Sequence, residues 1–427
     1  MKLRKIKRTR INREKKANYE WGIVILLSTL FGIAIMNRLT IVYLFPSMIS
    51  EFKINYAQAG ALTSILAITS AFSIWFFGIL SDRIGRKIIL IPATIFFSFM
   101  SWGSGLTHSF SQMLFARGLM GIGQGAVLPT SIATIAAESN PSRRGFNFGL
   151  HQALTPIISI GIGAVIVTQL TQIMSWRMVF FVVGLPGVIL SIILYLYMDE
   201  PADIRLAGKN NESDQLRKKP RFYAPMRYKN VIISSIVNSL MMCCLFVFFT
   251  FGMVYFVNER QLSVSDSGII MSLSGLTASL GCILLPLLSD RVGRKPIIIP
   301  SLFITGLSFF GIIVASANFF LLSLFASISG FAIGGVGPIA VSALTTECVP
   351  PDMAATASGI PASIGEIFGS ALMPFLAGYL CDLYGLKTAL YFSAVAPLIA
   401  GFVGLFYKET APKIIARELA MIPPVST

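Results

Sequence analysis

Two ionisable residues interrupt apolar stretches long enough to cross a membrane, and their chemistry suits the binding of an anion and a proton. Arg38 follows an apolar run that begins near residue 21, and Glu366 lies near the middle of the apolar segment 355–381. A guanidinium offers a planar fork of donors that fits a carboxylate or a phosphate. A carboxyl group in apolar surroundings takes up a proton more readily than one in water. The pattern therefore predicts an anion-binding cation and a proton-accepting acid.

Each of these two residues also has a purely structural interpretation. Arg38 lies past the middle of its segment, so its side chain could extend to lipid headgroups. Glu366 could serve only as the partner of an arginine or of a helix end. Against this, residues 243–247, which occupy the place equivalent to Arg38 in the second half of the chain, carry no charge. Scaffold charges tend to repeat with the scaffold, so the unrepeated Arg38 indicates ligand binding.

Five further polar residues lie in apolar segments and are weaker candidates. Arg117 and Gln124 are seven residues apart and share one helical face, where Gln124 can hydrogen-bond a substrate and Arg117 can serve either the site or the scaffold. Asn37 and Asn238 are further candidates for substrate binding. His151 can titrate near neutral pH and is a second candidate for proton coupling, although a wetted histidine costs little near the inner end of its segment, which favours a structural role.

The elements that must position these residues are apolar helices. The chain has 427 residues, of which 55% are hydrophobic and 12% charged, whereas soluble proteins carry about 25% charged residues. A membrane-spanning helix needs about 20 mostly apolar residues. The stretch 296–346 has no charge and is divided by the turn-forming residues 315–318. Uncharged runs bounded by charged loops predict twelve spans: 21–47, 57–80, 88–107, 112–136, 146–170, 177–198, 229–257, 266–288, 297–316, 319–345, 355–381 and 388–407. We therefore expect an all-α membrane protein.

Basic residues are concentrated in alternate loops. Most of the 34 Lys and Arg residues fall in six segments: 2–16, 83–87, 143–144, 205–229, 291–295 and 408–417. Because basic loops stay in the cytoplasm, we expect both termini to be cytoplasmic and the protein to lie in the cell membrane. The net charge of +15 is explained by these loops, so we expect the lipid bilayer and no nucleic acid as a partner.

Motifs for covalent or cofactor chemistry are missing from the sequence. The chain contains no P-loop, no zinc-ligand spacing and no nucleophile elbow. Its five cysteines are odd in number and lie mostly in apolar runs, which predicts neither a disulfide framework nor a metal site. We therefore expect no catalytic residue, no metal, no cofactor and no enzymatic activity.

The two halves of the chain repeat each other. The sequence of Leu80–Lys87 recurs 208 positions later at Leu288–Lys295, with one conservative change. Two equivalent helical bundles that face each other across a site near the middle of the membrane are typical of transporters. The expected domains are a basic N-terminus (1–20), a first six-helix bundle (21–198), a linker (199–228), a second bundle (229–407) and a tail (408–427).

The repeated loop resembles a family signature. Gly78-x-x-x-Asp82-Arg83-x-Gly85-Arg86-Lys87 and its second copy are similar to the loop between the second and third spans of the major facilitator superfamily. The resemblance implies two pseudo-symmetric bundles that rock around a central cavity. Charges in and near the two loops would then form gates. Arg86 would pair with Glu138 and Arg294 with Glu347, and these pairs would stabilise the outward-facing state and break for inward opening. These residues are Asp82, Arg86 and Glu138 in the first half and Asp290, Arg294 and Glu347 in the second. The alternative is that they are solvated charges that only set topology.

A second stretch supports a particular branch of that family. The run from Arg117 to Pro129, with glycines at 121, 123 and 125, resembles the fourth span of organic-anion symporters. Those proteins often carry Glu where this chain has Gln124, and Gln cannot titrate. The glycines are not a nucleotide loop, because no strand precedes them; they instead favour close helix packing.

We therefore expect a monomeric transporter that moves a small organic anion, a carboxylate foremost, together with protons. Arg38 would bind the anion and Glu366 would take the proton, releasing Arg38 from an internal pair. The alternative is proton-driven export of drugs or amphipathic cations, which suits Glu366 but not the positive Arg38. A non-transporting sensor would need a signalling domain, which neither terminus resembles.

Overall fold

The computed structural model describes residues 2–140, 143–199, 223–350, 353–412 and 414, with the backbone alone at 2–17, 82–83 and 355. Within these ranges the regular structure is helical, without a strand. Most of the expected linker (200–222) and most of the expected tail (415–427) lie outside the described residues. Twelve helical units of the described chain are long and apolar enough to cross a membrane. The all-α membrane fold expected from the sequence is therefore confirmed.

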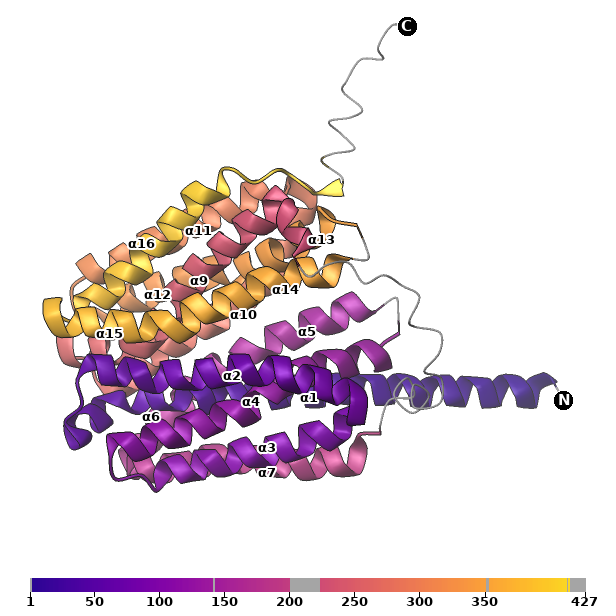
Figure 1. Cartoon of the computed structure of the whole chain (residues 1–427), viewed down its shortest axis with the longest axis horizontal. Coiled ribbons are helices and arrows are strands. Elements are labelled where there is room, and N and C mark those ends of the chain that lie inside the picture. The colour runs from indigo at the N-terminus through magenta and orange to yellow at the C-terminus, as the bar shows by residue number, and fades with distance from the viewer. Residues whose placement is uncertain (1, 141–142, 200–222, 351–352, 413, 415–427) are drawn as a thin grey trace, which may run out of the picture.

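The helices fall into two bundles (Figure 1). The first consists of α1 (Lys2–Phe52), α2 (Tyr56–Ile84), α3 (Arg86–Gly105), α4 (Phe110–Glu138), α5 (Arg144–Pro156), the π-helical η1 (Ile157–Ile162), α6 (Gly163–Ile173) and α7 (Trp176–Tyr197). The second consists of the short 3-10 turn η2 (Ala224–Arg227), α9 (Lys229–Val254), the π-helical η3 (Tyr255–Glu259), α10 (Val264–Val292), α11 (Lys295–Val314), α12 (Phe319–Gly334), the π-helical η4 (Pro338–Ala343), α13 (Leu344–Glu347), α14 (Ala354–Gly365), the π-helical η6 (Glu366–Leu372), α15 (Met373–Tyr384) and α16 (Lys387–Gly404).

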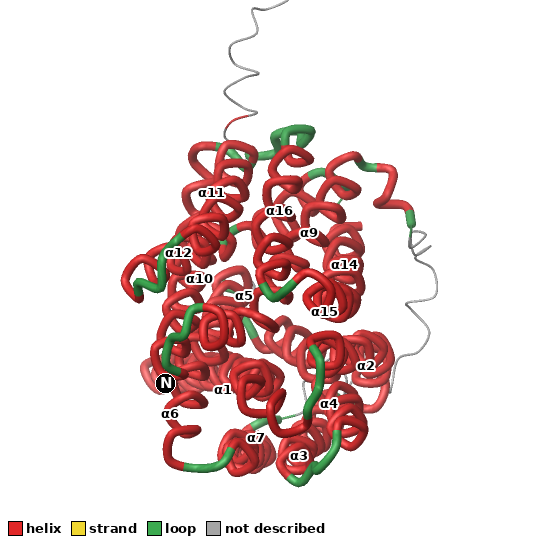
Figure 2. The backbone as a smooth tube through the Cα atoms, turned by 90° about the vertical axis from the view of Figure 1, so that its left-hand side faces the viewer, coloured by secondary structure: helices red, strands yellow, loops and turns green. Residues whose placement is uncertain are grey.

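The two bundles lie side by side with their helices roughly parallel, and the described chain begins and ends toward the same end of the molecule (Figure 1). We call this the terminal end and the opposite one the far end. The bundles contact each other mainly through α2 with α15 and through α10 with α5, η1 and α6. Figure 2, which views the molecule from the far end, shows these helices along the boundary between the bundles.

The repeated sequence adopts the same backbone in both halves. Gly85 ends α2 and Gly293 ends α10, and each has a φ of +118°, in the left-handed region that favours glycine. Any other residue at either position would be strained, so the sequence specifies the sharp turn between the second and third spans of each half. The charge-free stretch 296–346 breaks where expected, because the Asn318 side chain caps α12 by accepting the backbone N–H of Phe320 and Leu321.

The surface of the bundles is apolar and several polar side chains are buried, the reverse of a soluble protein. Phe72, Trp75 and Phe320 are more than 70% exposed. Buried hydroxyls such as those of Thr94 and Ser98 donate to carbonyls of their own helix, one turn earlier. Helices whose backbone groups are satisfied internally and whose outer faces are apolar suit a lipid environment, so the chain is a multi-pass membrane protein.

Candidate functional site

Arg38 and Glu366 form an ion pair that joins the two bundles. Arg38 Nη2 on α1 lies 3.0 Å from Glu366 Oε1 at the start of η6, although 328 residues separate them in the chain. The two side chains remain partly accessible, with 12% and 23% of their surface exposed. The guanidinium also lies over the Phe246 ring, 4.7 Å from its centroid. A cation, an acid and an aromatic face therefore meet at one partly open place between the bundles.

A second arginine holds the backbone beneath Arg38. Arg117 on α4 is fully buried, and its guanidinium donates to the carbonyl of Arg38 at 2.6 Å and to that of Asn37 at 3.4 Å. Gln124, two turns further along α4, donates through Nε2 to the Ala34 carbonyl at 2.8 Å. Ala34 lies one turn before Arg38 on α1. The polar residues of α4 that the sequence singles out thus bind the main chain of α1, and they fix where Arg38 leaves it.

Asn37 points away from the ion pair. Its side-chain amide donates to the carbonyl of Ile33 on its own helix and to that of Val183 on α7, and the residue is fully buried. It therefore ties α1 to α7 inside the first bundle. The predicted roles of Asn37, Gln124 and Arg117 in binding substrate stay predictions, and each of the three acts here on the scaffold around Arg38.

The glycines of α4 explain how this helix approaches its neighbours so closely. A Cβ at Gly125 would lie 2.5 Å from the Ser70 carbonyl on α2, and one at Gly121 would lie 2.5 Å from the Leu66 carbonyl. A Cβ at Gly123 would lie 3.0 Å from the Ala93 carbonyl on α3. The expected role of this glycine run in close helix packing is confirmed.

Glu366 is positioned by a break in its helix and by packing on α9. The span that carries it changes from α-helix to π-helix at Glu366, and such π-helical insertions are frequent at functional sites. Gly365 beside it leaves room for Asn238, whose side chain would clash with a Cβ there. Asn238 is buried and donates to the Pro361 carbonyl at 2.8 Å, so it links α9 to α14. Its predicted contact with substrate stays a prediction.

His151 lies inside the first bundle. It is 1% exposed, it stacks on Phe31 with ring centroids 5.2 Å apart, and its Nδ1 is 3.3 Å from Ser28 Oγ. Its Nε2 is buried without a hydrogen-bond partner in the described part of the chain. Its proton-coupling role is not tested by this geometry.

The predicted gate residues of the second half lie in one network at the terminal end. Arg294 pairs with Asp290 at 2.6 Å and with Glu347 at 2.7 Å, and it also donates to Ser289 Oγ. Burial alone would lower the pKa of Arg294, but the hydrogen bond and charge of Glu347, followed by those of Asp290, outweigh it and raise the pKa. The structure therefore brings these three residues together.

In the first half, Arg86 lies against α4. Arg86 is buried and donates to the Ala133 carbonyl at 3.0 Å, on the same α4 that ends at Glu138. The side chain of Asp82 lies outside the described residues. The pairing of Arg86 with Glu138 and the gating role of both trios stay predictions.

The sequence reasoning missed Glu409, which follows the last span. Its carboxylate accepts the backbone N–H groups of Arg294 and Lys295 at 2.9 and 3.0 Å, and so caps the start of α11. Its neighbour Thr410 donates to Glu347 at 2.6 Å. Burial alone would raise the pKa of Glu409, but four backbone N–H donors outweigh it and hold the pKa below its ordinary value. In the sequence, the local indication of this cap is that Glu409 is an acidic residue within the basic segment 408–417.

The reasoning also missed Asp382, which joins the bundles at the far end. Its carboxylate accepts the backbone N–H groups of Tyr56 and Ala57, at 2.8 and 2.9 Å, and so caps α2 of the other bundle. Beside it, a Cβ on Gly60 or on Gly378 would strike a backbone carbonyl of the opposite bundle. The far end is therefore a close, glycine-dependent contact between the bundles, and no local pattern in the sequence reveals it.

Comparison with known proteins identifies the family. Residues 26–367 and 288–421 match the Major Facilitator Superfamily. The chain is 29% identical over 341 residues to the 3-(3-hydroxy-phenyl)propionate transporter of Escherichia coli strain K12, covering 76% of this chain and 78% of that protein. It is 26% identical over 423 residues to the cis,cis-muconate transport protein of Acinetobacter baylyi, covering 93% and 97%. It is 24% identical over 374 residues to the probable 4-methylmuconolactone transporter of Cupriavidus pinatubonensis, covering 86% of each.

Solved structures share the fold. A bacterial homolog of the human lysosomal transporter Spinster, in an inward-facing and unoccupied conformation, superposes with a TM-score of 0.71 at 18% identity, covering 94% of this chain and 97% of that one. The nucleoside transporter NupG superposes with a TM-score of 0.72 at 18% identity, covering 92% and 100%. With the match to the family extending over most of its length, the chain belongs to the major facilitator superfamily and is a membrane transporter, not an enzyme.

Proposed function

We propose that this protein moves a small organic anion, foremost a carboxylate, across the cell membrane together with protons, by alternating access. The observation that carries the proposal is the ion pair between Arg38 and Glu366, which joins the bundles and remains partly accessible. The names of three relatives point to muconate, a muconolactone and a hydroxyphenylpropionate as their cargo. Phe246, whose ring lies beside the Arg38 guanidinium, adds an aromatic face that suits such molecules.

The ion pair gives a physical reason for coupling. Removing one partner of an ion pair leaves an uncompensated charge, which costs about 3–5 kcal/mol when the pair is fully buried and less for this partly exposed pair. Protonation of Glu366 alone would leave the Arg38 guanidinium without a negative partner. An anion bound to Arg38 alone would leave the Glu366 carboxylate without a positive partner. Two states avoid that cost: the empty carrier with its internal pair, and the loaded carrier with the anion on Arg38 and the proton on Glu366. Proton and anion therefore travel together.

The remaining polar residues have supporting roles in this proposal. Arg117, Gln124 and Asn37 hold the part of α1 from which Arg38 projects. Asn238 holds the helix that carries Glu366. His151, whose buried Nε2 has no hydrogen-bond partner among the described residues, is the second candidate for binding a proton.

The terminal end is cytoplasmic in this proposal, because most basic loops lie there. The contact at the far end, where Asp382 caps α2, then closes the outer side, so the conformation described here faces inward. Arg294 is paired with Asp290 and Glu347 within the second bundle in this conformation, so inward opening would leave that trio intact rather than break it.

Uptake by proteoliposomes tests this proposal. The probes are radiolabelled cis,cis-muconate and 3-(3-hydroxyphenyl)propionate, offered under an inward pH gradient. We expect Arg38→Gln to abolish uptake, and Glu366→Gln to lose gradient-driven accumulation while keeping exchange of labelled for unlabelled anion. Full gradient-driven uptake in both variants would overturn the mechanism. A cationic dye is offered in parallel: proton-driven dye extrusion without anion uptake would favour the exporter alternative.

A further inference from the structure

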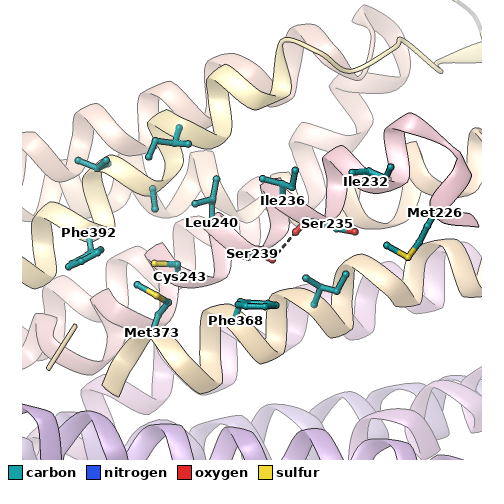
Figure 3. Close-up of a pocket in the computed structure, with 14 residues that line it drawn as sticks. Met226, Ile232, Ser235, Ile236, Ser239, Leu240, Cys243, Phe368, Met373 and Phe392 are labelled. Atoms are coloured by element: carbon teal, nitrogen blue, oxygen red, sulfur yellow. Dashed lines mark hydrogen bonds between the residues drawn. The ribbon is translucent and has the colours of Figure 1, made fainter. Parts of the chain in front are cut away.

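A groove with a cavity volume of about 570 Å³ opens on the second bundle, between α9, α16 and the helix formed by α14, η6 and α15 (Figure 3). On α9 its lining residues recur at the spacing of one helical face, from Ile232 through Ile236 and Leu240 to Cys243. Ile364 and Phe368 line it from the span that carries Glu366. Both are two residues from Glu366, which places them on the opposite side of that helix from the ion pair. The groove is therefore separate from the proposed transport site.

The chemistry of the lining fits hydrocarbon. Its members are aliphatic, aromatic or sulfur-containing side chains, apart from Ser235 and Ser239. Both hydroxyls are already used within α9, because Ser235 donates to the Val231 carbonyl and Ser239 donates to the Ser235 carbonyl. An occupant would find no free hydroxyl proton there. Ile236 and Phe368 are 44% and 54% exposed, so the groove opens toward the lipid rather than into the protein core.

The length of the groove matches one leaflet of a bilayer. From Ile232 to Cys243 the helix α9 rises by about 16 Å, at about 1.5 Å per residue. Half of the hydrocarbon core of a typical bilayer is about 15 Å. Since α9 begins at the terminal end, the groove runs from that membrane boundary to about the middle of the bilayer.

Basic residues neighbour the lining residues at the terminal end of the groove. Arg227 and Lys229 are exposed at the start of α9, next to the lining residue Met226. Lys408 is exposed after α16 and is held beside α9, because its backbone N–H and carbonyl both hydrogen-bond the side chain of Asn230. The next acid, Glu409, is engaged by the start of α11. The chemistry at this boundary thus favours an anion next to a hydrocarbon chain.

We propose that this groove binds one acyl chain of an anionic phospholipid from the leaflet on the terminal side, with the lipid phosphate held by Arg227, Lys229 and Lys408. The groove supplies the shape and the three cations supply the selectivity, since each basic residue near a membrane surface strengthens the binding of anionic lipid. This proposal does not depend on the identity of the transported solute.

Photo-crosslinking in nanodiscs tests the proposal. The full-length protein is placed in phosphatidylcholine nanodiscs with a trace of phosphatidylglycerol that carries a diazirine on its acyl chain, and adducts are mapped by mass spectrometry. We expect adducts to concentrate on the groove, including Ser239 and Phe368. The R227Q/K229Q/K408Q variant should reduce them by about tenfold or more, since three basic contacts are lost. A phosphatidylcholine probe with the same chain should label the groove no more than the lipid-facing Trp75.

Two further variants control for the loss of net charge and for the role of the groove itself. Neutralising Lys5, Lys7 and Arg8 removes the same net charge elsewhere and should leave groove labelling unchanged. Ile236→Trp fills the groove and should remove the adducts without altering any charge. Equal labelling by both lipid probes, or labelling that persists in the R227Q/K229Q/K408Q variant, would overturn the proposal.

Discussion

The guanidinium of Arg117 donates a 2.6 Å hydrogen bond to the backbone carbonyl of Arg38, so one buried arginine fixes the place from which another leaves its helix. Arg117 is fully buried, whereas Arg38 remains partly open and pairs with Glu366. Because Arg117 binds this carbonyl, the position of Arg38 depends on a second residue, whose hydrogen bonds in the described part of the chain go to the backbone of α1 and to Met120 rather than to Glu366. In this arrangement Arg117 positions Arg38, and Arg38 is the residue proposed to bind the anion. Substitutions of Arg117 can therefore test the positioning role without removing the binding cation.

Replacing Arg117 by Met should weaken anion binding without removing the binding cation. The carbonyls of Arg38 and Asn37 lose their donor, and a displacement of about 1 Å at a binding group can cost up to about a hundredfold in rate. We expect KM for the anion to rise by about tenfold or more, and Arg117→Lys to restore part of the loss. Initial rates of uptake over a range of anion concentrations measure this.

A matched control is available in the second bundle. Arg260 donates in the same way to two consecutive carbonyls, those of Ile312 and Ile313, at 3.0 and 2.6 Å. Arg260→Met should lower thermal stability but leave KM unchanged. An equal rise of KM in both variants would mean that Arg117 acts only through general stability.

The energy of the Arg38–Glu366 pair should appear in a double-mutant cycle. Arg38→Gln or Glu366→Gln alone leaves one charge without its partner, whereas the double variant leaves neither. Since both side chains are partly exposed, we expect a coupling energy of about 1–3 kcal/mol, below that of a fully buried pair. Denaturation of the four proteins in detergent measures it. Additive effects of the two single changes would show that the pair contributes nothing to holding the bundles together.

Asp382→Asn should loosen the contact at the far end. The neutral amide loses the attraction between a carboxylate and the start of α2, which is worth about 0.3–1 kcal/mol and up to about 2 kcal/mol when partly buried. We expect a several-fold larger population with the far end open. Electron-spin distances between labels at His108→Cys and Ala317→Cys, exposed positions at that end of each bundle, measure the population. An unchanged distance distribution would contradict the expectation.

Gly378→Val should prevent the far end from closing. A Cβ at Gly378 would strike the Tyr56 carbonyl of the other bundle, and that backbone atom cannot move aside while the bundles remain in contact. The same spin-label pair should report a longer distance, and uptake should fall to background. Gly359→Val is the control, because a Cβ at Gly359 meets no atom within 4 Å among the described residues. Equal effects of both changes would point to a general loss of folding.

Glu409 should make stability depend on acid pH. Its pKa is lowered in the folded protein, so its contribution is complete above the ordinary glutamate pKa of about 4.3 and is lost as the pH falls through the lower folded value. At pH 7, Glu409→Gln should cost about 0.5–1 kcal/mol through the weakened cap of α11. The difference in Tm from the parent protein should shrink between pH 5 and 3. Thermal unfolding across that range measures this, and a difference independent of pH would rule the cap out.

The sequence by itself determined the features that depend on short stretches of chain. The length and apolarity of its runs specified helices that cross a membrane, because the backbone must be satisfied internally in lipid. The repeated loop specified two equivalent halves, and its glycine specified the same turn in each, at Gly85 and Gly293. Arg38 and Glu366 were found as isolated charges because charges in such runs are costly unless they have a partner.

Only the tertiary structure decided which of these residues meet. Helical spacing assigns a residue to a face of its own helix, but it does not say which helix that face contacts. Arg38 meets Glu366 across 328 residues, while Gln124 turns to the backbone of α1. The cap that Asp382 places on α2 has no counterpart in local sequence at all. Contacts between distant spans depend on the packing of whole bundles, and therefore on every helix that lies between them.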